Sequence, residues 1–365
     1  VEVVLNNPDK FKIVALAANC SHGLFNKQLS ALRPAYAVLA DESAAKKITE
    51  VPAGTRFYSG EEAALAAASY EEADIVLVAA GGFAGLKYSL AAINAGKVLA
   101  LANKETLVCG GDLVMPLIKK RGGDIRPVDS EHSAIWQCLG FNLAAPFKRL
   151  LITASGGAFR DFTPEQLGSV TPEMALRHPT WNMGAKITID SATMLNKGFE
   201  VIEAHHLFGA EYAAITAVLH PQSIVHSMVE FCDGAIVAQL SNPTMKLPIQ
   251  LALGYPERAP TEGAEPDFSK ALSLSFEPIS RGRFPCFDIA LDCARAGGTL
   301  PCVLNAAGEV AVHAFLSGGL KFTDIARVID GTVCREPALR VESYEQLCET
   351  DARARAVAAE LIAGL

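Results

Sequence analysis

The first hundred residues alternate between short, uninterrupted apolar runs and segments with helical periodicity. The apolar runs cover residues 12–19, 36–40, 73–80 and 97–102, and the helical patterns lie near residue 28 and over residues 61–68 and 89–96. Strands that are apolar throughout are typical of a parallel sheet with helices on both faces. The pattern therefore predicts an α/β chain that begins with a doubly wound nucleotide-binding domain.

The middle of the chain has a different pattern, which is typical of an α+β domain. A strand is expected over residues 149–157, and a long helix is expected from about residue 191 to residue 208, ended by Gly209. Two β-rich runs flank Asp233-Gly234, and this dipeptide is a strong hairpin signal. The loop over residues 177–184 is expected to lead into a further strand.

Pro, Gly and charged residues are concentrated between residues 253 and 284, and we interpret this stretch as a surface linker. The segments that follow have helical periodicity with Gly at their ends, which predicts a small helical bundle. The expected domains are a nucleotide-binding domain over residues 1–128, a catalytic domain over 129–254, the linker over 255–284 and a C-terminal helical bundle over 285–365.

Composition and charge exclude several classes of protein. The chain has 365 residues, of which 50% are hydrophobic, and a formal net charge of -8. It can therefore bury a sizeable core, but it offers no basic stripe to a nucleic-acid backbone. No apolar run reaches the ~20 residues that a membrane-spanning helix needs. We expect neither a nucleic-acid partner nor a membrane partner.

Nine cysteines are scattered along the chain without a C-x-x-C pair. An odd number without pairing argues against a secreted disulfide framework and against a zinc knuckle, so we expect free thiols in the cytoplasm. The sequence begins at Val1, in what looks like the end of a helix. The natural start is expected upstream, which leaves a targeting segment, for example for a plastid, open.

Three carboxylates are candidates for a metal site. Asp129 and Glu131 are separated by one residue, so in an extended segment their side chains would point to the same side. Glu200 lies on the predicted long helix, where Asn196, Lys197 and Glu203 share its face. Oxygen ligands alone suit Mg²⁺ or Mn²⁺ rather than zinc. The alternative is a solvated acidic face, because most charged side chains are exposed.

A second set of residues is suited to a phosphate group. Ser155 precedes Gly156-Gly157, where backbone N–H groups can form an anion-binding nest. Ser191 lies near the start of the predicted helix, where it can be a phosphate ligand or an N-cap. The alternative interpretations are an ordinary glycine turn and an ordinary capping serine.

The loop RHPTWNMG contains His178, Trp181 and Met183 between Pro and Gly residues. A tryptophan in an otherwise exposed loop is consistent with a lid that closes over a substrate. It is equally consistent with a side chain that plugs an edge of the core.

One chain contains six long motifs: LANKE, PVDSEH, ITASGG, HPTWNMG, DSATMLNKGFEVIEA and HPQSIVHSMVEF. The chain resembles the 1-deoxy-D-xylulose 5-phosphate reductoisomerase family over its whole length. The resemblance implies an enzyme that depends on NADPH and on Mn²⁺ or Mg²⁺, with a phosphorylated sugar as its substrate. Its product would be 2-C-methyl-D-erythritol 4-phosphate, in the non-mevalonate isoprenoid pathway, and it would act as a homodimer through its catalytic domain.

The resemblance also implies roles for particular residues. The metal ligands would be Asp129, Glu131 and Glu200. The catalytic residues would be Lys104, Ser130, Glu131, His178 and Trp181. The substrate would bind at Ser130, Glu131, Ser155, His178, Ser191, Asn196, Lys197 and Glu200. The cofactor would bind at Asn19, Cys20, Ser21, Asn103, Lys104, Glu105, Gly184 and Met245. Ser223 and Met245 match further positions that line the active site, and Met183 matches the mobile flap together with His178 and Trp181.

Two other interpretations stay open at the level of sequence. The family's glycine-rich turn is absent, because the chain begins inside the helix that should follow it. A metal-dependent sugar-phosphate isomerase or aldolase without nucleotide binding is therefore one alternative. An inactive homologue that serves as a dimeric binding protein is another. No Asp or Glu follows the apolar run that ends at Ala18, which agrees with a 2′-phosphate on the cofactor.

Overall fold

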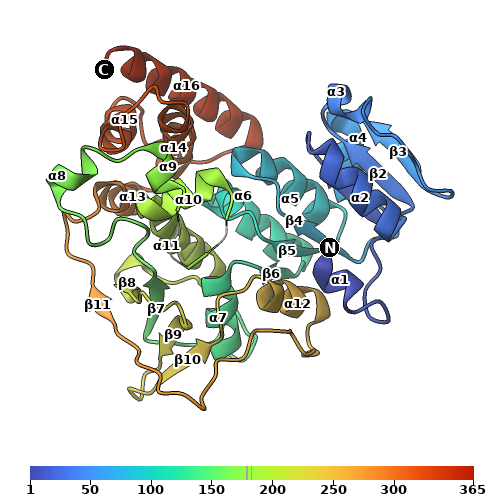
Figure 1. The fold of residues 1–365 in the computed structure, drawn as a ribbon, viewed down its shortest axis with the longest axis horizontal. Coiled ribbons are helices and arrows are strands. Elements are labelled where there is room, and N and C mark those ends of the chain that lie inside the picture. The colour runs from blue at the N-terminus through green and yellow to red at the C-terminus, as the bar shows by residue number, and fades with distance from the viewer. Residues whose placement is uncertain (178–179, 182) are drawn as a thin grey trace. The chain divides into compact units, whose positions relative to one another are not determined.

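The computed structural model describes residues 1–177, 180–181 and 183–365 (Figure 1). These residues fold into two compact units. Unit 1 consists of Val1–Asn103, Leu117–Val128 and Met245–Thr261, and unit 2 consists of Lys104–Pro116, Asp129–Thr244 and Glu262–Leu365. No helix of the described residues is long and apolar enough to span a membrane.

The first sheet of unit 1 is parallel, with the strand order β1-β2-β3. Alternate residues of β2 point to opposite faces of the sheet. Ala37 and Leu39 pack against α2 through Phe25 and Leu29, whereas Tyr36 and Val38 pack against α4. Both faces of β2 are therefore buried, which is why its sequence is apolar throughout. These elements are β1 (Ala15–Ala18), α2 (His22–Leu32), β2 (Tyr36–Leu39), α3 (Glu42–Ala45), β3 (Arg56–Ser59) and α4 (Glu61–Ala68).

A second parallel sheet of unit 1 has the strand order β4-β5-β6. In the described residues the strands form these two separate parallel sheets, and β1 and β4 are edge strands. The edge position explains why Leu77 of β4 is 37% exposed, whereas Leu99 and Leu101 of β5 are fully buried. The remaining elements of unit 1 are α1 (Glu2–Leu5), β4 (Ile75–Val78), α5 (Gly85–Asn94), β5 (Val98–Leu101), β6 (Ile125–Pro127) and α12 (Lys246–Gly254).

Unit 2 contains a mixed sheet with the strand order β10-β9-β7-β8-β11. The hairpin at Asp233-Gly234 is confirmed: β9 and β10 are antiparallel, and Gly234 has φ 88°. Part of the expected linker forms β11, which pairs with β8. The strands are β7 (Arg149–Ala154), β8 (Ile215–Leu219), β9 (Val225–Glu230), β10 (Ile236–Leu240) and β11 (Glu277–Pro278).

The helices of unit 2 include the C-terminal bundle that the periodicity predicts, in which α14 packs against α13, α15 and α16 (Figure 1). The chain enters unit 2 in α6 (Glu105–Arg121), whose residues up to Pro116 belong to this unit. The others are α7 (Ser130–Cys138), α8 (Pro164–Leu167), α9 (Pro172–Ala175), α10 (Ala185–Ala192), α11 (Leu195–Phe208), α13 (Pro285–Ala296), α14 (Leu300–Leu316), α15 (Asp324–Val333) and α16 (Tyr344–Ala363).

Two expectations for the segment before Gly209 are wrong. The residues after Gly184 form the helix α10 and not a strand. The long helix is interrupted, because Met194 has φ 61° and separates α10 from α11. Gly209, with φ 62°, ends α11 as the sequence predicts.

A carboxylate and lysine centre in unit 2

Three carboxylates converge between the start of α7 and the helix α11. Oxygen atoms of Asp129, Glu131 and Glu200 lie within 4.8 Å of one another. The interpretation of an extended Asp-x-Glu segment is wrong. Asp129 is the N-cap of α7 and accepts a hydrogen bond from the Glu131 N–H at 3.1 Å, so the helix start brings the two carboxylates together.

Two buried lysines hold these carboxylates. The Lys104 Nζ donates to Asp129 Oδ2 at 2.5 Å and lies 3.3 Å from Glu200 Oε1. Lys197 Nζ lies 2.9 Å from Glu131 Oε1 and also pairs with Glu200. Lys197 and Glu200 are one turn apart on α11, as their spacing predicts.

The charges in this centre shift each other's proton affinity. Burial alone would lower the pKa of Lys104, but Asp129 and Glu200 outweigh burial and raise the pKa well above its usual value. Burial opposes the charge of Asp129 as well, but Lys104 and His132 hold its pKa well below the usual range. Burial and then repulsion by Glu131 raise the pKa of Glu200. An added cation would favour the ionised form of Glu200.

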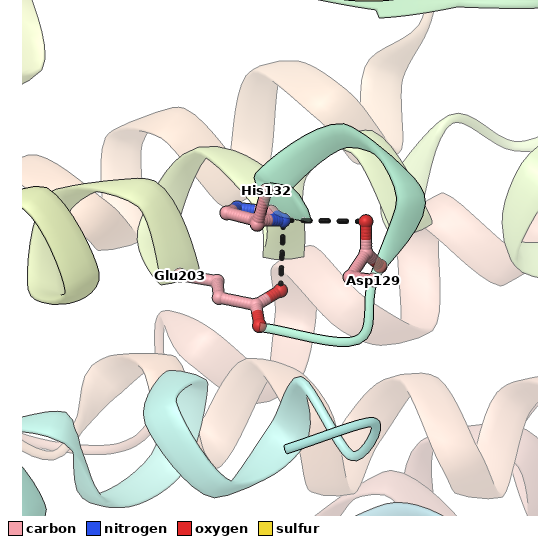
Figure 2. A group of neighbouring side chains, drawn as sticks. All are labelled: Asp129, His132 and Glu203. Carbon is pink, nitrogen blue, oxygen red and sulfur yellow. Dashed lines mark hydrogen bonds and ion pairs between the residues drawn. The ribbon is translucent and has the colours of Figure 1, made fainter. Parts of the chain in front are cut away.

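A second layer lies behind the first, as Figure 2 shows for Asp129, His132 and Glu203. His132 Nδ1 is 3.2 Å from Asp129 Oδ1 and 3.3 Å from Glu203 Oε2, and its Nε2 is 2.9 Å from the Glu200 carbonyl oxygen. Both ring nitrogens face acceptors, so both must donate, and the ring is an imidazolium. Burial opposes this charge, but Glu203 and Asp129 raise the pKa of His132.

Glu203 was predicted to lie on the polar face of the helix, but the contacts of His132 with the carboxylates were not predicted. The signal was present, since His132 follows Asp129 by three residues and Glu203 follows Glu200 by three. Residues three apart on a helix share a face. Only the packing of α7 against α11 shows that these two faces meet.

The residues fit a hard divalent cation. Among the described residues, the three carboxylates of the first layer carry more negative charge than the two ammonium groups that pair with them can balance. Neither oxygen of Glu203 receives a hydrogen bond within the described part of the chain. The first-layer donors are all carboxylate oxygens, the ligands that Mg²⁺ and Mn²⁺ prefer.

The segments that carry Ser155 and Ser191, two of the candidate phosphate residues, lie against each other in unit 2. Gly157 has φ 71°, and a Cβ there would lie 2.5 Å from the Ser191 carbonyl oxygen. Glycine thus allows the turn after Ser155 to approach the end of α10 closely. Ser191 lies in the last turn of α10, so the N-cap interpretation is wrong.

Polar side chains around the carboxylates donate hydrogen bonds to them. Asn196 Nδ2 donates to Glu200 Oε1 at 2.5 Å, and Ser130 Oγ donates to Glu131 Oε2 at 2.5 Å. Asn196, Lys197, Ser130 and the carboxylates therefore form one connected group.

Of the loop residues, Trp181 and Met183 are partly buried, and His178 lies outside the described residues. The Trp181 indole meets the His226 ring edge-on, with ring centroids 6.1 Å apart. Gly184 is the N-cap of α10. His226 and His220 both have hydrogen-bond partners in the sheet region. His226 Nε2 lies 3.3 Å from the Ser241 carbonyl oxygen, and His220 Nε2 accepts from the Ile224 and Val225 N–H groups at 3.1 Å.

The candidate cofactor residues of unit 1 follow the carboxyl ends of parallel strands. Asn19, Cys20 and Ser21 follow β1, and the Ser21 hydroxyl makes no capping bond to α2. Asn103 follows β5 and donates to the Gly82 carbonyl at 3.0 Å. Ligands of such sheets bind at these ends. Met245 is 39% exposed, and Glu105 of unit 2 pairs with Lys186.

Fold and site together define a class: an α/β protein with a carboxylate centre for a hard divalent cation, beside a serine and glycine turn suited to a phosphate. Three sequence profiles match the chain. Those described as 1-deoxy-D-xylulose 5-phosphate reductoisomerase, its C-terminal domain and DXP reductoisomerase C-terminal domain match residues 1–111, 125–208 and 240–357. The chain belongs to the 1-deoxy-D-xylulose 5-phosphate reductoisomerase family.

Relatives cover nearly the whole chain. The 1-deoxy-D-xylulose 5-phosphate reductoisomerase of Pelotomaculum thermopropionicum is 46% identical over 368 residues, which is 100% of this chain and 95% of the relative. The solved structure of the Zymomonas mobilis enzyme in complex with NADPH has a TM-score of 0.92 and 39% identity, covering 100% of this chain and 95% of that one. A DOX-P reductoisomerase in complex with NADPH, fosmidomycin and magnesium has a TM-score of 0.93 and 37% identity, covering 99% and 94%.

Proposed function

We propose that this chain converts 1-deoxy-D-xylulose 5-phosphate to 2-C-methyl-D-erythritol 4-phosphate with NADPH and a divalent metal ion. The observation that carries the proposal is the centre of Asp129, Glu131 and Glu200 in unit 2. Relatives with 46% identity are named as this reductoisomerase, and related structures contain NADPH and magnesium. The intact carboxylate centre argues against an inactive binding protein.

Asp129, Glu131 and Glu200 would hold Mg²⁺ or Mn²⁺. When bound, the ion polarises the substrate's carbonyl and hydroxyl oxygens and stabilises negative charge as the carbon skeleton rearranges. Lys104 and Lys197 hold the carboxylates in place, because each ammonium lies within ion-pair distance of two of them. His132 fixes Asp129 and the backbone of Glu200 from behind.

The substrate's phosphate would bind at Ser155, Ser191, Asn196 and Lys197. The close approach of Gly157 to Ser191 supports this assignment, because it brings the two serine segments together. A phosphate anchored away from the reacting carbons contributes binding energy that orients the rest of the substrate. Lys104 and Ser130 lie beside the carboxylates, where they would face the reacting oxygens.

NADPH would bind along the strand ends of unit 1, with Asn19, Cys20, Ser21, Asn103 and Met245 as contacts. When bound, it supplies the hydride that reduces the rearranged aldehyde. The Ser21 hydroxyl at the start of α2 and the lack of an acid after β1 favour a 2′-phosphate, and hence NADPH over NADH.

Trp181 would close over the bound substrate, together with His178. The Trp181 indole is only partly buried and meets the His226 ring edge-on, whereas a core tryptophan is fully buried. We expect Trp181→Ala to lower turnover with little loss of melting temperature. Truncation of a core tryptophan typically costs ~3–5 kcal/mol. A large fall in melting temperature with normal turnover in the folded fraction would contradict the lid.

The protein would act in the cytoplasm as a homodimer. All nine cysteines are free, as a reducing compartment requires. The edge strand β10 of unit 2 exposes Ile236 and Val237 at 54% and 43%, and Phe268 is 71% exposed. Apolar side chains on a sheet edge favour burial against a second copy. Light scattering of Ile236→Glu, expected to be monomeric, tests this surface.

The test of function is NADPH oxidation by the full-length protein with 1-deoxy-D-xylulose 5-phosphate and Mn²⁺. We expect turnover that requires both the metal and NADPH and is abolished by chelation. Rearranged sugar phosphate without NADPH consumption would instead support a metal-dependent isomerase.

A further inference from the structure

Lys186 connects three segments of unit 2 without touching the carboxylate centre itself. It lies in the first turn of α10, and its Nζ is 2.7 Å from Asp190 Oδ2 and 3.5 Å from Glu105 Oε1. The same Nζ lies 5.2 Å from the centre of the Phe199 ring. One ammonium thus contacts α10, the start of α6 and α11.

Each of these contacts is the chain neighbour of a site residue. Glu105 follows Lys104, Asp190 precedes Ser191, and Phe199 precedes Glu200. Backbone shifts of a few tenths of an ångström at the three contacts are therefore passed directly to an ammonium, a hydroxyl and a metal-binding carboxylate.

The ion pairs at Lys186 are mostly shielded from water. The side chains of Asp190 and Glu105 are 3% and 14% exposed, and Asp190 Oδ1 has no hydrogen-bond partner among the described residues. Burial opposes the charge on Lys186, but Asp190, Glu105 and Glu309 outweigh it and raise the pKa. Removing the ammonium would leave the buried Asp190 carboxylate without its ion pair, so the end of α10 would move toward water.

We propose that Lys186 is a positioning residue for the reaction, because it fixes Lys104, Ser191 and Glu200 relative to one another. This inference rests on the proposed function. Lys186 acts through Glu105, Asp190 and Phe199, so its loss disturbs phosphate binding through Ser191 and metal binding through Glu200 together.

The test compares Lys186→Met, Lys186→Arg and the control Lys87→Met. Lys87 of unit 1 is a close match, since its Nζ lies 2.8 Å from Glu61 and 5.2 Å from the Tyr88 ring centre. Its side chain is 25% exposed, against 32% for Lys186. The readouts are kcat and KM for 1-deoxy-D-xylulose 5-phosphate, measured well below each melting temperature, and the Kd for Mn²⁺ alone.

We expect Lys186→Met to raise KM and the Mn²⁺ Kd and to lower kcat, each by about 10-fold, the scale of lost support behind a metal site. Lys186→Arg should restore most of these values because it keeps the charge. Lys87→Met should lower the melting temperature but leave kcat, KM and Kd unchanged. Wild-type kinetics and Kd in folded Lys186→Met would overturn the proposal.

If Lys186→Met does not fold, Asp190→Asn is measured instead, because it removes only the ion pair at the end of α10. A higher KM supports the proposal, and a wild-type KM overturns it. If the wild type itself shows no turnover, the proposed function fails. The Mn²⁺ Kd of the Lys186 and Lys87 variants still tests the positioning by itself.

Discussion

The two ends of α11 bury titratable side chains with opposite results. Near its start, Lys197 and Glu200 are buried, and each faces opposite charges. In its last turn, His206 faces no ion partner within the part of the chain that the structure describes, and burial, followed by the neighbouring His205, lowers its pKa to about 3. The first end therefore stays charged, whereas the second stays neutral. The charged groups around each side chain, rather than burial itself, therefore determine whether that side chain is charged.

The packing at the second end has clear causes. His205 Nδ1 lies 2.7 Å from the Ala210 carbonyl, and its ring stacks on Tyr212 at 4.3 Å. Gly111 lies against the His206 ring, where any Cβ would overlap it. The histidines thus complete the end of the helix and have no place in the proposed reaction.

The largest expected effect follows from removing a charge at the first end. Glu200→Gln should lower NADPH-dependent turnover by at least ~10²–10³-fold, because one oxygen ligand and the charge that balances Lys104 and Lys197 are lost. Steady-state kinetics at a Mn²⁺ concentration that saturates the wild type measure this loss.

Glu230→Gln is the matched control for that variant. Glu230 also pairs with two cations, Lys148 at 2.7 Å and Arg149 at 2.6 Å, but at the end of β9 in the same unit, where both cations are exposed. We expect its turnover to equal the wild type. Equal turnover in Glu200→Gln and the wild type would remove Glu200 from the metal site.

A smaller effect is expected one turn further along α11. Glu203→Gln removes the carboxyl group that faces the His132 ring, so Asp129 loses part of its support from behind. Loss of such support typically costs ~10–100-fold in activity or metal affinity, and we expect turnover to fall by that factor. Glu203→Asp should recover part of the loss. Wild-type turnover in Glu203→Gln would show that the second layer is only structural.

The smallest effect concerns the neutral end and appears as pH dependence. The pKa of His206 is about 3 in the folded protein and 6.5 in the unfolded chain, so its contribution is complete above pH 6.5 and is lost as pH falls toward 3. At pH 5 the loss is about 1–2 kcal/mol.

His206→Gln should therefore reduce the fall in melting temperature between pH 7.5 and pH 5. His313→Gln, which changes an exposed histidine of α14, is the control and should not alter that fall. A His206→Gln protein with the wild-type acid sensitivity would mean that His206 is protonated in the fold.

The sequence predicts well where local pattern and burial agree. The apolar runs became buried parallel strands, and Asp233-Gly234 formed its hairpin. The segment after Gly184 was wrongly expected to be a strand because Ile187, Thr188 and Ile189 are β-branched. In the fold, Thr188 and Ile189 are buried, and Lys186 pairs with Asp190 at helical spacing, so packing and this local pair outweigh the β propensity.

The candidate site was predictable in its residues more than in its geometry. Asp129, Glu131 and Glu200 converge, but through a helix N-cap rather than an extended segment. The roles of His132 and Lys186 depend on contacts between α7 and α11 and between α10 and α6, which no spacing within one segment encodes.

The most direct test of the central claim is the Mn²⁺ binding isotherm of wild type, Glu200→Gln and Glu203→Gln, measured without substrate or NADPH. The account predicts one Mn²⁺ per wild-type chain, no saturable binding in Glu200→Gln, and affinity reduced by ~10–100-fold in Glu203→Gln. Wild-type affinity in Glu200→Gln would contradict a metal centre at Asp129, Glu131 and Glu200.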